Sequence, residues 1–148
     1  MADIIKYRRR GAIFVNNLAS AYNVAMIPLC EETHLKVHQL DMLLFLSENP
    51  EQSTARDICK CLWLKPGLVS MSVDELVDMG YLVREAVPGD RRKVCLMLTE
   101  KAETLTGRVL KLQSEFIDRA KQGLSAKEKD QLEHFFDIIF DNIDQMSH

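Results

Sequence analysis

Apolar residues return every three or four positions along most of this chain, a spacing typical of α-helices with one buried face. In the first such segment, residues 4–27, the stripe contains Val15, Leu18, Tyr22 and Ala25. Similar stripes predict further helices over residues 34–47, 54–62, 66–79, 99–122 and 125–143. With no internal repeat or low-complexity tract, the pattern indicates a mainly helical folded protein.

The predicted helix ends contain residues whose chemistry suits a cap or a stop. Proline has a fixed φ and no amide proton, so we expect Pro28 to end the first helix and Pro66 to begin the fourth. Thr33 is the expected cap of the second helix, and Gly80 the expected stop of the fourth. Further caps and stops are expected at Thr54 with Asp57, at Thr99, at Gly123, and at Ser125 with Glu128.

Two strand-like runs, YLVREAV and KVCLML, lie between the fourth and fifth predicted helices. The segment PGDRR joins them, and Pro88 with Gly89 fits the centre of a type II turn. The third and fourth helices, short then longer and joined by a tight turn, match a helix-turn-helix, and the strand pair after them makes a wing. The expected fold class is therefore mainly α (α+β): a winged helix-turn-helix with long N- and C-terminal helices.

Charge is unevenly distributed along the chain. The net charge is −3, yet residues 53–102 hold eight Lys or Arg residues against seven Asp or Glu residues. Arg91 and Arg92 lie together at the predicted hairpin tip, where neither a core nor a tight turn needs them. Two exposed guanidinium groups favour a negative partner. The chain shows no targeting signal and no continuous apolar run that spans a bilayer, so we expect a cytoplasmic protein without a membrane partner.

The segment TARDICKCLWLKPGLVSMSVDELVDMGYLVREAVPGDRRKVCLMLTEKA resembles the winged-helix core of MarR-family transcriptional regulators, above all in DRRKVCLMLTEKA. The resemblance implies a homodimer on palindromic double-stranded DNA, with residues 66–79 as the recognition helix in the major groove. It places Arg91 and Arg92 in the minor groove. It also implies a single continuous fold, with a helical dimerisation region over residues 1–32 and 101–148 and a DNA-binding lobe over 33–100. The expected dimerisation residues are Ile4, Ile5, Phe136, Ile139, Phe140 and Ile143.

The predicted recognition helix departs from the family pattern. Family members often have Thr-Arg where this chain has Ser70-Met71, so the paired arginine contact to guanine is missing there. Met71 suits either a thymine methyl group or partly buried packing, and Asp90 suits either orienting a wing arginine or closing the turn. The helix also contains Asp74, Glu75 and Asp78. The expected DNA contacts are Lys65, Gly67, Ser70, Met71, Ser72, Arg91 and Arg92. The basic run KYRRRG is expected to be a solvated helix face near the partner subunit.

The resemblance also implies an effector, since family members usually lose DNA affinity when a small molecule binds between the dimerisation helices and the DNA lobe. The candidates for lining such a site are Phe14, Tyr22, Met26, His38, Met42, Phe45 and Phe116, although aromatic and Met residues at helical spacing are often core. No metal or other cofactor is expected. His34 and His38, four apart and preceded by Cys30, Glu31 and Glu32, are weak metal candidates.

The four cysteines are expected to be thiols in a reducing cytosol, with Cys30, beside a helix start, the most acidic. The leading hypothesis is a dimeric, ligand-responsive repressor. An enzyme is disfavoured, because no phosphate loop, nucleophile elbow or HExxH motif occurs in the sequence. The alternative is a winged-helix module that binds protein and has no specific DNA site, which the acidic recognition helix supports.

Overall fold

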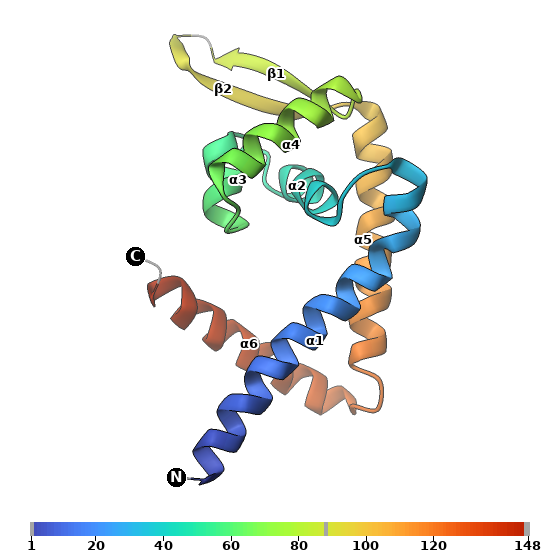
Figure 1. Cartoon of the computed structure of the whole chain (residues 1–148), viewed down its shortest axis with the longest axis vertical. Helices are drawn as coiled ribbons and strands as arrows, with labels where there is room; N and C mark the ends of the chain where they lie inside the picture. The colour runs from blue at the N-terminus through green and yellow to red at the C-terminus, as the bar shows by residue number, and fades with distance from the viewer. Residues whose placement is uncertain (1, 88, 147–148) are drawn as a thin grey trace. The chain divides into compact units, whose positions relative to one another are not determined.

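The computed structural model describes the backbone of residues 2–87 and 89–146; the side chains of residues 2–9, 12, 91 and 92 lie outside the description. Its element order is the predicted one, four helices, a hairpin and two helices (Figure 1). The elements are α1 (Ala2–Thr33), α2 (Val37–Glu48), α3 (Ala55–Cys61), α4 (Pro66–Asp78), β1 (Leu82–Val87), β2 (Asp90–Leu98), α5 (Glu100–Ala120) and α6 (Ala126–Met146).

The chain forms two compact units, Met1–Gln113 and Ser114–His148, with the division inside α5. The first unit contains the hydrophobic core, to which α1, α2, α3, α4, the hairpin and the first half of α5 all contribute. Five fully buried members are Met26, Leu40, Leu43, Leu76 and Val109. This core holds the helix-turn-helix and the hairpin as one packed body. Which residues make the dimer and which make the DNA lobe stays a prediction.

α1 is longer than the sequence predicted, because it continues through Pro28 to Thr33. A proline inside a helix removes one backbone hydrogen bond and favours a break. Here Pro28 is exposed while the next residue, Leu29, is buried in the core at 3% exposure. Burial of Leu29 requires the helical direction to continue past the proline, so tertiary packing overrides the local stop signal.

The start of α2 also differs from the expectation. Thr33 does not cap it: its hydroxyl donates to the Leu29 carbonyl of α1 at 2.6 Å. His34 follows in the left-handed region, with φ of 59°, and ends α1. α2 begins only at Val37, and the Lys36 amide donates to Gln39 Oε1 at 2.8 Å. A side chain three residues ahead thus satisfies a backbone donor at this helix start.

The remaining predicted caps and stops are confirmed. Thr54 and Asp57 form the capping box of α3, and Pro66 occupies the first turn of α4. Gly80 ends α4 with φ of 74°, a conformation that costs other residues energy. The equivalent markers further along are Thr99, whose hydroxyl accepts from the Ala102 amide, Gly123 with φ of 92°, and Ser125 with Glu128 at the start of α6.

The hairpin is an antiparallel pair with Leu82 opposite Leu98 and Ala86 opposite Val94. The register shifts between Ala86 and Val87, and Gly89 has φ of 86°, as the second central position of a type II turn requires. Pro88 lies outside the described residues. β1 packs against α4, and the turn of the hairpin points away from α5 (Figure 1). The hairpin therefore stands beside the helix-turn-helix as a wing.

One stretch of α1, Ile13–Thr33, is long and apolar enough by length and composition to cross a membrane, with mean hydropathy of 1.3. This differs from the sequence-based expectation, which considered only uninterrupted apolar runs. Core helices of soluble proteins and signal sequences meet the same criterion. The stretch lies largely unburied, and its exposed apolar side chains include Phe14 and Val15.

Candidate nucleic-acid interface

The solvent face of α4 begins with the residues that the sequence assigned to DNA. Lys65, which precedes the helix, and Gly67, Ser70 and Met71 are all exposed. Met71 is 49% exposed, which favours an outward-facing side chain over core packing. The opposite face of α4 carries Val69, Val73 and Leu76 into the core. α4 therefore presents a continuous, weakly charged surface at its N-terminal half.

Ser72 is an exception and corrects the sequence-based assignment. It is 1% exposed, and its Oγ lies 3.0 Å from Nε2 of His38 in α2, within hydrogen-bond distance. A side chain so buried does not reach a DNA surface. The signal was present in the sequence, because residue 72 is three positions after Val69 and four before Leu76, on the same helical face as the apolar stripe.

Two of the three acidic residues in α4 have partners within the lobe. Asp74 pairs with Arg84 of β1. Glu75 accepts from the Gln39 amide group of α2 at 2.6 Å, and Lys36 lies 3.6 Å from the same carboxylate oxygen. Much of the negative charge that counted against DNA is therefore neutralised or turned towards α2.

Two basic residues beside the α4 surface, one in the wing and one in α3, were absent from the sequence-based assignment. Arg84 lies in β1, and together with Arg56 of α3 it lines a hollow of about 500 Å³ between α3, α4 and the hairpin. Pro66 and Ser70 of the α4 surface line the same hollow. The backbone of Arg91 and Arg92 forms the start of β2 next to the turn, as expected. Their side chains lie outside the described residues, so their groove contact stays a prediction.

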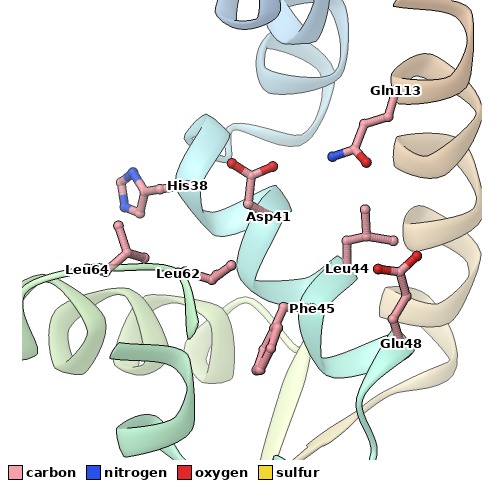
Figure 2. A pocket seen from close by; sticks show the side chains of 8 residues that line it. All are labelled: His38, Asp41, Leu44, Phe45, Glu48, Leu62, Leu64 and Gln113. Atoms are coloured by element: carbon pink, nitrogen blue, oxygen red, sulfur yellow. The ribbon is translucent and has the colours of Figure 1, made fainter. Parts of the chain in front are cut away.

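A second cavity, of about 290 Å³, runs along α2 and is called here the α2 cavity. Its floor is one stripe of α2, and its sides come from the α3–α4 connection and from α5 (Figure 2). Its lining consists of His38, Asp41, Leu44, Phe45, Glu48, Leu62, Leu64 and Gln113. His38, Asp41, Phe45 and Glu48 follow spacings of three, four and three, a pattern that the sequence displays.

The predicted effector residues divide into several groups. His38 and Phe45 line the α2 cavity. Met26 and Met42 are 0% exposed and belong to the core, so they are removed from the set. Phe14 is 59% exposed on α1. Phe116 is half-buried and lies in the second compact unit.

Tyr22, the remaining candidate, is joined to two residues of the cavity wall. Its hydroxyl donates to Asp41 Oδ1 at 2.5 Å and accepts from Gln113 Nε2 at 2.5 Å. Burial, followed by the bond to Asp41, raises the pKa of Tyr22, and burial raises the pKa of Asp41. Tyr22 thus connects α1, α2 and α5 behind the cavity.

His38 is the first residue, along the chain, of the α2 stripe that lines the cavity. Burial and then the nearby Lys36 cation lower its pKa, against smaller opposing effects of Asp41 and Glu75. We therefore expect a neutral imidazole at pH 7. Because His38 lines the α2 cavity and also contacts Ser72 of α4, it links the two candidate sites.

The structure bears on the weak metal candidates His34 and His38 and on the expected acidity of Cys30. His34 precedes α2, so His34 and His38 do not share one helix face. No group of three or more metal-ligating residues occurs in the described part of the chain. Cys30 lies near the end of α1 rather than at a helix start, and burial raises the pKa of its thiol. The prediction of an acidified Cys30 is therefore wrong.

The predicted dimerisation residues of α6 are all solvent-accessible in the single chain. Phe136, Ile139, Phe140 and Ile143 are 37–62% exposed, and none of the described residues of α6 is buried. Phe136 and Phe140 stack on one another one turn apart, with ring centroids 5.8 Å apart. The backbone of Ile4 and Ile5 is helical in α1, and their side chains lie outside the described residues.

Comparison with known proteins extends these observations. Residues 35–93 match the model of the MarR family. The chain is 39% identical over 71 residues to the uncharacterized HTH-type transcriptional regulator YkoM of Bacillus subtilis, covering 48% of this chain and 46% of that protein. It is 37% identical over 73 residues to the transcriptional repressor MprA of Escherichia coli K12, covering 49% and 42%. The chain thus spans about half the length of the curated relatives it matches.

Solved structures share the fold over nearly the whole chain. A MarR transcriptional regulator from Methanosarcina mazei Go1 superimposes with a TM-score of 0.80 at 19% identity, covering 93% of this chain and 99% of that one. CouR from Rhodococcus jostii RHA1, bound to p-coumaroyl-CoA, has a TM-score of 0.69 at 24% identity, covering 86% and 87%. The winged lobe of this chain is therefore similar in sequence to the MarR family, and the chain shares the fold of solved MarR-family structures.

Proposed function

We propose that this protein is a dimeric, cytoplasmic DNA-binding repressor of transcription whose affinity for DNA is set by a small-molecule effector. α4 enters the major groove of a palindromic site, and the hairpin places Arg91 and Arg92 in the adjacent minor groove. The observation that carries this proposal is the exposed, weakly charged N-terminal face of α4, standing beside a two-stranded wing.

Charge neutralisation within the lobe supports this role. Arg84 offsets Asp74, and Glu75 faces α2, so the outward surface of α4 is less negative than its sequence. Lys65 and Arg56 then remain near that surface for contact with phosphates. Such contacts supply much of the affinity of a DNA-binding protein, whereas base contacts supply the specificity.

The proposal of a dimer rests on apolar surface that the single chain leaves uncovered. α6 exposes its phenylalanines and isoleucines, and α1 exposes Phe14 and Val15. Exposed apolar side chains gathered on one helix of a folded chain mark an interaction site, and each of these two helices is considered by itself. A second copy that covers these helices places two winged lobes on one palindrome.

The experiment begins with selection of binding sites from a random duplex library, using the full chain. Fluorescence anisotropy then measures affinity for the selected site over a range of salt concentrations. We expect tight binding that falls steeply with salt, and a large loss in Arg91→Ala/Arg92→Ala. The matched control is Arg8→Ala/Arg9→Ala, which removes the same charge from the N-terminal run and is expected to bind normally.

Two outcomes count against the proposal. A selection that returns no enriched site removes the specific DNA-binding role. Equal affinities of the wing variant and its control remove the wing from the interface. In the first case the exposed Asp78 and the pair of Asp74 with Arg84 favour the alternative, a winged-helix module that binds protein.

A further inference from the structure

We propose that the α2 cavity binds a small organic cation, an amine with an aromatic or alkyl body, with Asp41 and Glu48 as its counter-charges. This inference rests on the proposed effector-responsive function and names the class of effector. It follows from three separate observations: the charge of the cavity, its lining and volume, and the contacts that join its wall to α4.

The charge of the cavity is one-sided. Asp41 and Glu48 contribute two carboxylates, and burial lowers the pKa of His38, which disfavours a positively charged imidazole there. None of the described residues that line the cavity is Lys or Arg. An anionic ligand in this space faces two like charges, whereas a cation gains from both.

Asp41 is prepared for a positive partner. It is only partly exposed, and its carboxylate is held by the Tyr22 hydroxyl rather than by a lysine or arginine among the described residues. A partly buried carboxylate without a counter-ion is costly, because burial disfavours the charged form. An ammonium group in the cavity supplies the missing charge, and the fixed position of Asp41 lowers the entropic cost of binding.

The rest of the lining suits the body of such a ligand. Phe45 offers an aromatic ring for cation–π or stacking contact, and Leu44, Leu62 and Leu64 provide apolar walls (Figure 2). Gln113 brings an amide group from α5. A cavity of about 150 Å³ holds benzene, so the volume of about 290 Å³ admits one ring with a short charged arm.

An occupant of this cavity touches a residue that contacts the recognition helix. His38 lines the cavity, and its Nε2 atom lies 3.0 Å from Oγ of Ser72 in α4. Gln39, beside it on α2, bonds Glu75 of α4. A ligand that displaces His38 therefore acts on α4 directly, through packed side chains.

The test uses three probes of similar size that differ in charge: 2-phenylethylamine, 2-phenylethanol and phenylacetate. Isothermal titration calorimetry measures their binding to the full-length protein without DNA, so that the result does not depend on the DNA proposal. We expect the amine to bind at least about tenfold more tightly than the carboxylate, with the alcohol between them.

Variants then assign the preference to the cavity. Asp41→Asn and Glu48→Gln should each reduce the preference for the amine severalfold. Because Asp41→Asn also alters the bond to Tyr22, Tyr22→Phe serves as its partner: it removes the hydrogen bond and keeps the charge, and should retain the preference. Glu51→Gln removes an exposed carboxylate outside the cavity and should change nothing.

Three results overturn the inference: phenylacetate binding as tightly as the amine, no probe binding at all, or a preference unchanged in both Asp41→Asn and Glu48→Gln. A separate anisotropy measurement asks whether the amine releases the selected DNA. If the amine binds at the cavity but DNA is retained, the ligand class stands and the effector-responsive part of the proposed function fails.

Discussion

Individual residues set the ends of the helices in this fold through their backbone conformation. Gly80 ends α4 at φ of 74°, and open space surrounds the position of an added Cβ. Gly107 has equally open space but lies inside α5. At neither position would an added methyl group touch a neighbouring residue. Alanine substitutions at these two glycines therefore test the backbone conformation and not steric clashes.

Gly80→Ala is expected to lower the free energy of unfolding by about 1–2 kcal/mol, since alanine is strained in the left-handed region. Gly107→Ala should instead raise it by roughly 0.5–1 kcal/mol, because alanine favours the helix. Urea denaturation at fixed protein concentration measures both. Equal effects of the two substitutions would contradict the assignment of Gly80 as a left-handed stop.

His38 gives a prediction for acid stability. Its folded-state pKa lies below the ordinary value of 6.5, so between the two pKa values the unfolded chain holds more protons. The free energy of unfolding therefore rises with pH in that window. On acidification, the contribution is lost progressively below about pH 6.5 and changes no further below the folded pKa.

The measurement compares urea denaturation of the wild type, His38→Gln and His134→Gln from pH 5 to 8. His38→Gln should show a weaker loss of stability on acidification than the wild type. His134 is exposed on α6, so His134→Gln should follow the wild-type curve. A His38→Gln curve parallel to the wild type would show that His38 titrates as in the unfolded chain.

At the scale of elements, ionic contacts between neighbours decide what surface α4 offers. Arg84 of β1 pairs with Asp74, and Glu75 accepts a hydrogen bond from Gln39 of α2 and lies near Lys36, which precedes α2. These exposed or partly exposed pairs add little to stability. Their effect is on the electric field at the surface, since each offsets a carboxylate of α4 that would repel a negatively charged partner.

Arg84→Gln is therefore expected to weaken binding to the selected DNA, because it removes a cation and leaves Asp74 uncompensated. Adding Asp74→Asn to that variant should restore part of the affinity. Anisotropy titrations in several salt concentrations measure both, and a direct phosphate contact by Arg84 adds a fall of about 0.9 in the salt slope.

The control for this series is Arg119→Gln, which removes an exposed cation from the last turn of α5. It should leave the affinity for DNA unchanged. If the double variant binds no better than Arg84→Gln, neutralisation of Asp74 is not what Arg84 contributes.

At the scale of the whole molecule, the balance of buried and exposed apolar surface distinguishes the two compact units. The first unit buries a complete core, whereas α6 buries none of its described residues. Exposure of phenylalanine and isoleucine side chains to water is unfavourable. Burial of these side chains of α6 against a second copy would therefore stabilise an assembly.

Phe136→Glu/Phe140→Glu is expected to convert a dimer into a monomer, because two charges replace a stacked aromatic pair on α6. Analytical ultracentrifugation over a range of concentrations measures the change. Gln131→Glu adds charge at an exposed polar position of the same helix and should remain dimeric. A dimer that persists in the double variant would place the interface elsewhere.

Local sequence determined most of the elements. The caps at Thr54 with Asp57 and at Ser125 with Glu128 each join residues three positions apart. The local sequence therefore contains both groups of each cap. Pro66, Gly80 and Gly89 are local signals in the same sense. For this reason the order of helices and strands followed from the sequence, whereas the exposure of Met71, which the sequence left open, came only from the structure.

Tertiary structure decided the features that join distant segments. Pro28 stays within α1 because the next residue, Leu29, is buried in the core. The α2 cavity combines one stripe of α2 with leucines from the α3–α4 connection and a glutamine of α5. The sequence displays each residue, but the packing of helices around one core brings their side chains to a common space.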